Sequence, residues 1–120
     1  MRKKILVVDD DPEVVELLSF NLQKAGFAIG RAANGVEALK KIGSISPDLI
    51  VLDLMMPDMT GFDVVQQLRA DPQTQDIPIL VFTAKDVTEE DRQHLKDHVR
   101  AIVSKTGKDD LLRELEKSAR

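Results

Sequence analysis

The sequence predicts an α/β fold in which a parallel sheet carries helices on both faces. Short apolar runs alternate with longer segments of helical periodicity, five times along the chain, and this alternation is typical of a parallel sheet. The runs at residues 5–8, 49–52 and 79–82 are continuously apolar, as expected for strands buried on both faces. Right-handed crossovers then leave few strand orders.

The helices are predicted from their apolar spacing and from the residues that begin and end them. Asp11 followed by Pro12 is typical of a helix start, because Asp caps the helix and proline fits its first turn. Gly26 is expected to end that helix. Thr88 begins a pattern like a capping box, with Asp91 where Glu or Gln is usual. The predicted helices begin after Asp11, at Val36, at Phe62, after Thr88 and after Asp109, and the second and third end at Ile42 and Ala70.

The helices show apolar stripes that are expected to face the sheet. These stripes are Val14, Leu17, Leu18 and Leu22 in the first helix, Val36, Leu39 and Ile42 in the second, Phe62, Val65 and Leu68 in the third, and Leu111, Leu112 and Leu115 in the last. The fourth helix has few apolar residues, chiefly Leu95. Such spacing at three and four residues is the pattern of a helix with one buried face.

The predicted strands are short and lie at residues 5–8, 27–32, 49–52, 79–82 and 101–103. The strand at 27–32 contains a glycine and is suited to a sheet edge. Together the elements form one domain over residues 1–120, without an interdomain linker or internal repeat. A chain of this length buries roughly two-thirds of its unfolded surface, so its core needs no disulfide or metal to support it.

The composition argues against several classes of protein. The net charge is −4, so a phosphate backbone would be repelled on average, and we expect no direct nucleic-acid binding. The longest apolar runs are far shorter than the roughly 20 residues of a membrane span, and the basic start is too weakly apolar for a signal peptide. The sequence contains no Cys, which fits a reducing compartment. We therefore expect a cytoplasmic protein without membrane insertion.

Carboxylates follow two of the buried strands. Asp9 and Asp10 come directly after residues 5–8, and Asp53 comes directly after residues 49–52. In open parallel sheets ligands bind at the carboxyl ends of strands, so these acids meet in one crevice if the two strands are neighbours. Packed carboxylates repel one another unless a cation lies among them. Oxygen ligands without nearby His or Cys favour Mg²⁺ or Mn²⁺ over Zn²⁺.

Two further side chains would complete a site for a phosphoryl group. Thr83 follows the strand at 79–82 with a hydroxyl, and Lys105 follows the last strand with an ammonium. Taken singly, each is equally consistent with an ordinary surface residue. Together with a metal and a carboxylate, they can bind a phosphoryl group, and the carboxylate can act as the nucleophile that becomes an aspartyl phosphate.

Other polar residues have structural explanations. Asp11 is expected to cap a helix rather than to bind a ligand. Asp58 and Asp63 are interpreted as solvated surface acids. His94 and His98 lie one helical turn apart, but on a polar helix they are expected to face solvent rather than a metal.

The site residues together resemble the receiver domains of two-component response regulators. The resemblance rests on Ile-Leu-Val-Val-Asp-Asp at 5–10, on Asp53 followed by Met-Met-Pro and then Gly61, on Thr83-Ala84, and on Lys105. It covers the whole chain. It implies a flavodoxin-like (βα)5 fold, with a five-stranded parallel sheet of order 2-1-3-4-5 and helices on both faces.

The resemblance also implies a role for each residue. Asp53 would accept a phosphoryl group from a sensor histidine kinase or a histidine phosphotransfer domain, in a Mg²⁺-dependent reaction. Asp10 would bind Mg²⁺ directly, Asp9 mainly through water, and Met55 through its backbone carbonyl. The residues that would contact the phosphoryl group are Thr83, Ala84 and Lys105. The signal would leave through the fourth helix, fifth strand and fifth helix, at residues 88–116, towards an output domain or target protein.

On this reading the chain is a signalling domain that catalyses its own phosphorylation and dephosphorylation, and not an enzyme for other substrates. Met55 and Lys85 lie two residues beyond Asp53 and Thr83. Neither side chain is suited to orient an attacking water, so we expect slow self-dephosphorylation. We also expect a monomer or weak dimer, because the later elements carry no large apolar stripe.

Three departures from the family concern the relay away from the acceptor. Thr106 stands where the family usually has proline, so we expect a trans bond, since a cis bond there costs about 2.5–4 kcal/mol. Ile102 stands where the family often has Tyr or Phe, so an aromatic rotamer switch cannot operate. Residues 97–100 replace the usual Gly-Ala. The Lys-Thr-Gly sequence at 105–107 and the acidic start of the fourth helix are similar to receivers attached to hybrid sensor kinases.

Three alternative functions have sequence requirements of their own. A haloacid-dehalogenase-type phosphatase needs a second acid two residues after its nucleophile, where this chain has Met55. A flavodoxin-like electron carrier needs a hydroxyl-rich phosphate loop after the first strand, where this chain has acids. A receiver-like docking module that works without phosphorylation is favoured by Ile102 and Thr106.

Overall fold

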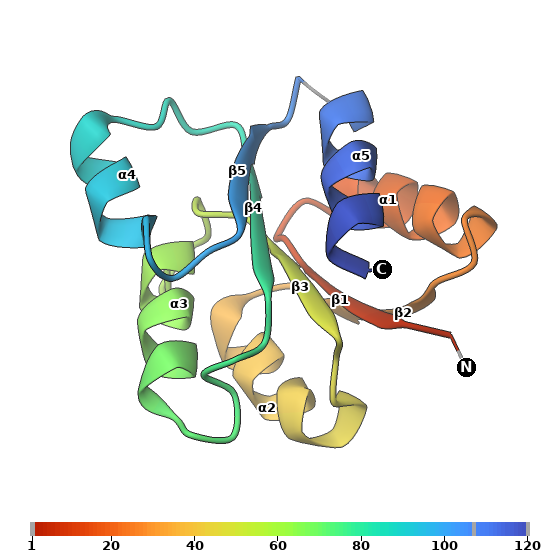
Figure 1. Ribbon diagram of the computed structural model, residues 1–120, viewed down its shortest axis with the longest axis horizontal. Helices are drawn as coiled ribbons and strands as arrows, with labels where there is room; N and C mark the ends of the chain where they lie inside the picture. The colour runs from red at the N-terminus through yellow and green to blue at the C-terminus, as the bar shows by residue number, and fades with distance from the viewer. Residues whose placement is uncertain (1, 107, 120) are drawn as a thin grey trace.

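The computed structural model describes residues 2–106 and 108–119, in which five strands alternate with five helices (Figure 1). The strands are β1 (Lys4–Val8), β2 (Ala28–Ala32), β3 (Leu49–Leu52), β4 (Ile79–Thr83) and β5 (Ala101–Ser104). The helices are α1 (Pro12–Lys24), α2 (Gly35–Ile45), α3 (Gly61–Ala70), α4 (Glu89–Leu95) and α5 (Lys108–Ala119). Every predicted element is present, and Gly107, expected just before the last helix, lies outside the described residues.

All five strands run parallel in the order β2-β1-β3-β4-β5, which confirms the predicted topology. In the centre of the sheet, Val8 of β1 lies opposite Leu52 of β3. The next residue of each chain segment is an acid, and the Asp53 amide donates to the Val8 carbonyl at 3.0 Å. This register brings Asp9 and Asp53 out at the same edge of the sheet.

The helices divide between the two faces of the sheet (Figure 1). On one face, α1 and α5 contribute Leu18, Leu22, Leu111 and Leu115 to a core with the strands. On the other face, α2, α3 and α4 form a second core with the strands. Strands β1, β3 and β4 are therefore covered on both sides, which explains their continuous apolar runs. Within the described residues, no helix is long and apolar enough to cross a lipid bilayer.

Two of the predicted apolar stripes are displaced around their helices. Leu17 of α1 and Val36 of α2 were expected to be buried, but they are 39% and 46% exposed. The buried positions include Val15 and Ser19 in α1, with Gly35, Ala38 and Ile42 in α2. Spacing identifies an apolar face, but packing against the sheet sets the rotation of a helix about its axis, and small residues allow the closest approach.

The helix starts follow the capping signals and add one that was missed. Asp11 caps α1, and Thr88 with Asp91 forms the predicted capping box of α4. Asp63 is exposed, as expected, but it also has a structural role, because its carboxylate accepts from the Thr60 amide at 3.1 Å. The two residues form the capping box of α3. The signal was present in the sequence, since Thr-x-x-Asp occurs at both helix starts.

Gly61 begins α3 directly against the chain segment that carries Asp53. A Cβ at Gly61 would collide with the Asp53 carbonyl oxygen and lie 2.7 Å from Leu54 Cα. Both obstacles are backbone atoms, so they move only if the segment after β3 moves. Gly43, in α2, has no heavy atom within 4 Å of the same position. The two glycines therefore provide a matched pair for testing close packing beside Asp53.

We expect Gly61→Ala to destabilise the protein by about 1–3 kcal/mol, the usual cost of forcing extra atoms into a packed region. Gly43→Ala should instead stabilise it by about 0.5–1 kcal/mol, because alanine loses less backbone entropy than glycine in a helix. The free energy of unfolding from urea titrations measures both. Equal or same-sign effects would contradict the close approach at Gly61.

Candidate functional site

The carboxyl ends of the strands bring five of the predicted site residues together, namely Asp9, Asp10, Asp53, Thr83 and Lys105. Carboxylate oxygens of the three acids lie within 4.8 Å of one another. Asp9 and Asp53 are buried, at 3% and 4% exposed, whereas Asp10 faces solvent. The site therefore has a buried floor with an open side at Asp10.

The carboxylate of Asp53 is fixed by contacts to both of its oxygens. Thr83 Oγ1 donates to Oδ1 at 2.8 Å, and the Met55 amide donates to the same oxygen at 3.2 Å. Lys105 Nζ donates to Oδ2 at 3.1 Å. A hydroxyl, an amide and an ammonium thus define the orientation of one buried carboxylate.

Lys105 bridges two of the acids. Its ammonium lies 2.8 Å from Asp9 Oδ2 and 3.1 Å from Asp53 Oδ2, and 18% of its side chain is exposed. Burial alone would lower the pKa of Lys105, but hydrogen bonds and charge from Asp9 and Asp53 outweigh it and raise the pKa above its ordinary value. The side chain is therefore charged at neutral pH.

Asp9 is the acid of the cluster whose ionised form is disfavoured by burial. Burial raises the pKa of its carboxyl above the ordinary value, against the lowering effects of Lys105 and of the Asp11 amide, which donates to Oδ1 at 2.9 Å. The charge of Asp53 adds to the increase. Three carboxylates and one ammonium leave net negative charge, and their oxygen-only ligand set fits a hard divalent cation.

The remaining predicted site residues lie around this cluster. Met55 is 56% exposed beside Asp53, and Ala84 is also exposed. The roles expected for the Met55 carbonyl and the Ala84 amide stay predictions. Ile102 is partly buried and packs against the core on the α2, α3 and α4 face. The Lys105–Thr106 peptide bond is trans, as expected, and the Thr106 hydroxyl hydrogen-bonds with the Ser104 hydroxyl at 2.9 Å.

The other polar residues keep mostly structural roles. His94 and His98 are exposed, as expected, and His94 lies 3.9 Å from Glu90 on its own helix. Asp58 is exposed and adopts a left-handed backbone conformation, with φ of 67°. Short polar side chains tolerate this conformation better than most. Within the described residues, the acids that could share a metal ion are those at the strand ends.

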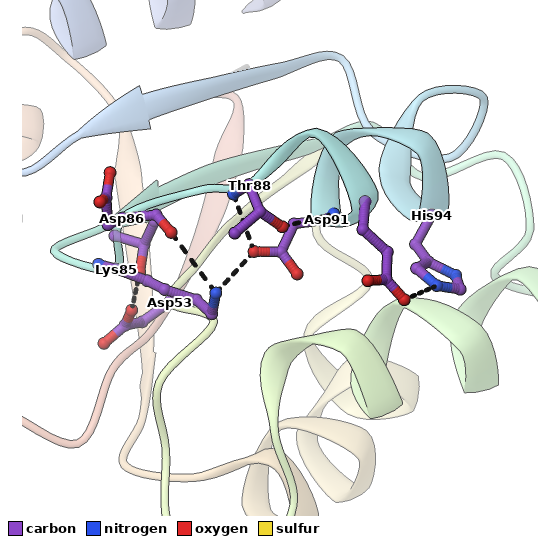
Figure 2. Close-up of polar contacts among 8 residues, drawn as sticks. Asp53, Lys85, Asp86, Thr88, Asp91 and His94 are labelled. Carbon is purple, nitrogen blue, oxygen red and sulfur yellow. Dashed lines mark hydrogen bonds and ion pairs between the residues drawn. The ribbon is translucent and has the colours of Figure 1, made fainter.

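The contacts of Lys85 with Thr83 and Asp91 were not predicted from the sequence. Its amide donates to Thr83 Oγ1 at 3.1 Å. Its ammonium lies 2.5 Å from Asp91 Oδ2 at the start of α4 (Figure 2). From its place two residues after Thr83, the sequence indicates only that Lys85 is not suited to orient an attacking water. The spacing of six residues to Asp91 crosses a loop, and no periodicity predicts which side chains meet across a loop.

The chain belongs to the family of response regulator receiver domains, whose model matches residues 5–116. Such domains are signalling domains of two-component systems, and the match confirms the family expected from the sequence.

Among curated proteins, the transcriptional regulatory protein PhoP for alkaline phosphatase synthesis from Bacillus subtilis is 51% identical over 86 residues, covering 72% of this chain and 35% of that protein. The DNA-binding dual master transcriptional regulator RpaA from Synechocystis is 46% identical over 81 residues, covering 68% of this chain and 34% of that protein. The chain thus spans about a third of the length of these relatives.

Solved structures agree with the fold. The chemotaxis protein CheY4 from Vibrio cholerae has a TM-score of 0.89 with 31% identity, over 100% of both chains. The response regulator TrrA from Thermotoga maritima, in complex with Mg²⁺ and BeF, has a TM-score of 0.85 with 37% identity, over 98% of this chain and 99% of that chain. The flavodoxin-like fold predicted from the resemblance is confirmed.

We expect Asp9→Asn to stabilise the metal-free protein at neutral pH. The raised pKa of Asp9 means that its ionised form is disfavoured in the folded state. The protonated Asp9 carboxyl contributes fully to the stability of the folded protein below the pKa that it has in the unfolded chain. This contribution is lost as the pH rises through the higher pKa that it has in the folded protein. The advantage of the variant should therefore be largest at neutral pH and shrink as the pH falls through the pKa of Asp9.

Unfolding midpoints across this pH range, in protein stripped of metal, measure the effect. Asp97→Asn serves as the control, because Asp97 is exposed and its loss should change stability little at any of these pH values. A wild-type protein that is more stable than Asp9→Asn at neutral pH would contradict the prediction.

Proposed function

We propose that this chain is a phosphoacceptor receiver domain of a two-component phosphorelay, in which Asp53 takes the phosphoryl group. One observation carries the proposal, namely that Thr83 and Lys105 contact opposite oxygens of a buried carboxylate. A hydroxyl donor and an ammonium in these positions suit the oxygens of a group attached to Asp53. The neighbouring acids Asp9 and Asp10 supply the negative charge that a divalent cation needs.

The proposed reaction is a phosphoryl transfer with Asp53 as the nucleophile. A carboxylate oxygen forms the new P–O bond, while the P–N bond of a phosphohistidine breaks and the imidazole leaves. With acetyl phosphate, a P–O bond breaks instead and acetate leaves. Lys105 and Thr83 then donate to the phosphoryl oxygens and offset their charge, as such groups do in other phosphoryl-transfer sites.

The acids fit Mg²⁺, with Mn²⁺ as a substitute that accepts the same oxygen ligands. In the proposed site Asp10 and Asp53 bind the ion directly, Asp9 mainly through water, and Met55 through its backbone carbonyl. When bound, Mg²⁺ supplies positive charge beside the phosphoryl oxygens. The ligand chemistry supports this, as does the Mg²⁺ and BeF complex of the Thermotoga structure, which concerns that protein.

The proposed partners follow from the reaction. A sensor histidine kinase or a histidine phosphotransfer domain would donate the phosphoryl group to a domain comprising residues 1–120. The signal would leave through α4, β5 and α5, residues 88–116, towards an output domain or target protein. Gly107 in this range, and the side chains of Lys108, Asp109 and Glu116, lie outside the described residues. Complete switching from 1:99 to 99:1 requires about 5.5 kcal/mol of difference in binding between two states.

A second candidate function is docking without phosphorylation. The observation that favours it is the aliphatic Ile102, which packs against a core in place of an aromatic ring. On this alternative the acids would be a remnant of the site, and the protein would act by binding alone. The following experiment separates the two candidates, because only the first requires a covalent adduct at Asp53.

Incubation with Mg²⁺ and acetyl phosphate should add one phosphoryl group to the wild-type protein, as measured by intact mass. Asp53→Asn should take none. Lys105→Met should slow phosphorylation by about a hundredfold, because a positioned charge that stabilises the transition state is removed. Lys24→Met is the matched control, since Lys24 lies exposed in the last turn of α1.

No adduct on the wild-type protein, or an adduct that survives Asp53→Asn, would sink the proposal and favour docking alone. Removing Mg²⁺ with a chelator should abolish the adduct. Undiminished phosphorylation without any divalent ion would remove the metal from the mechanism.

The aspartyl phosphate should be long-lived, because the exposed Met55 side chain offers no hydrogen bond to an attacking water, and Lys85 is engaged with Asp91. Met55→Asn should shorten the lifetime by about tenfold, since an amide at this position would orient the water. Met55→Leu, which is also apolar, is the control. Decay of the adduct after removal of acetyl phosphate measures the lifetime, and equal decay in all three proteins would contradict the explanation.

A further inference from the structure

We infer that Lys85 and Asp91 form a positioning pair, which couples the acceptor Asp53 to the first turn of α4 and serves as a relay where position 102 has no aromatic ring. The inference rests on the proposed phosphorylation of Asp53 and adds to it the route by which the site communicates with α4. Three features of the structure support it, namely the contacts of Thr83, the double use of Asp91 and the weak anchoring of α4.

The first feature is the Thr83 hydroxyl, which lies between Asp53 and Lys85. Thr83 is 1% exposed, and it donates to Asp53 Oδ1 at 2.8 Å while it accepts from the Lys85 amide at 3.1 Å. A hydroxyl has one proton, so its single donor contact selects its orientation. A phosphoryl group on Asp53 would offer this proton a new acceptor, and the Lys85 backbone would follow the hydroxyl.

The second feature is the carboxylate of Asp91, which serves two partners. Its Oδ2 accepts from Lys85 Nζ at 2.5 Å and from the Thr88 amide at 3.1 Å. The Asp91 amide in turn donates to Thr88 Oγ1 at 3.1 Å, which closes the capping box of α4. Displacement of Lys85 therefore acts on the same oxygen that holds the first turn of the helix.

The ion pair is partly shielded from solvent. The Lys85 and Asp91 side chains are 32% and 16% exposed, so solvent and salt screen their charges less than they screen a fully exposed pair. The Lys85 ammonium and the Thr88 amide lower the pKa of the Asp91 carboxyl. Figure 2 shows the Lys85 ammonium between the Asp86 carbonyl and Asp91 Oδ2 at the start of α4. The same Asp91 oxygen accepts from the Thr88 amide.

The third feature is that the short helix α4 relies on the contacts of its first turn to stay folded and in place. It has seven residues, of which Leu95 is the buried one, and a helix this short is unstable without external contacts. A groove of about 760 Å³ separates it from α3 and is lined by Phe62, Val65 and Leu95, among others. The helix is thus an element whose position can respond to a change at its first turn.

Ile102 cannot supply the same connection. It is partly buried beside the core of this face and has no polar atom in its side chain. The polar contacts from Thr83 through Lys85 to Asp91 are continuous in the structure. Coupling between two sites is reciprocal, so the pair should also strengthen binding of a phosphoryl group at Asp53.

The test uses beryllofluoride with Mg²⁺, a mimic of a phosphoryl group on a carboxylate, and the full 120-residue chain. Its affinity is measured by titration, and amide hydrogen exchange in α4 is measured with and without it. Lys85→Met removes the ammonium but keeps the amide that donates to Thr83. Asp91→Asn removes the charge but keeps an oxygen for the Thr88 amide.

Two further variants control the experiment. Glu90→Gln is the matched control on the same helix, because the Glu90 side chain is 86% exposed and lies no closer than 3.9 Å to its partner His94. Lys85→Arg keeps a positive charge and should keep the coupling. If Asp91→Asn does not fold, Lys85→Met still decides the question, because it leaves the capping box intact.

In the wild-type protein, the mimic should slow exchange of the first-turn amides of α4. Lys85→Met and Asp91→Asn should each lose this response and bind the mimic about fivefold more weakly, which is at the low end of measured coupling between sites. The double variant should be no weaker than either single variant, because both remove one interaction. Glu90→Gln and Lys85→Arg should behave like the wild-type protein.

If the mimic slows amide exchange in α4 of Lys85→Met as much as in the wild-type protein, the inference is overturned while the proposed function stays intact. Additive losses in the double variant would have the same consequence. Failure of the wild-type protein to bind the mimic in the presence of Mg²⁺ would overturn the proposed function, and the inference would fall with it.

Discussion

The central interaction of this protein is the contact of the Lys105 ammonium with the buried carboxylates of Asp9 and Asp53. Removing one partner of a buried ion pair is costly, because it leaves an uncompensated charge out of water. The ammonium therefore makes it tolerable to place two acids at the ends of buried strands. Its single positive charge does not balance the three carboxylates of Asp9, Asp10 and Asp53, and the remaining negative charge is what suits the site to a cation.

The sheet makes this interaction possible. Parallel pairing of β1 with β3 places Asp9 and Asp53 at one edge, and the Lys105 amide is tied to the Thr83 carbonyl at 3.0 Å. Helices on both faces bury the strands and leave their carboxyl ends open. The site is thus built by residues at or just after the ends of strands, and the amides of Asp9, Asp53 and Lys105 each donate a hydrogen bond to the backbone of a neighbouring strand. This arrangement gives positional accuracy without a dedicated binding loop.

The elements most accurately predicted were those with a local physical cause. Apolar runs located the strands, and the start of α1 followed from Asp11, whose side chain caps the helix. The capping box of α3 was overlooked although Thr60 and Asp63 display the same pattern as Thr88 and Asp91. The burial of Leu17 was predicted wrongly, because the rotation of a helix on a sheet depends on contacts far apart in the chain.

The sequence by itself determined the order of elements, the residues available at each strand end and the family to which the chain belongs. These depend on local patterns and on residue types that a chemical site requires. Only the tertiary structure decided which charges meet, since Lys105 and Asp53 are 52 positions apart, and Lys85 reaches Asp91 across a loop. Side-chain contacts between such segments depend on packing and solvent exclusion, which act through space and leave no periodic mark on the sequence.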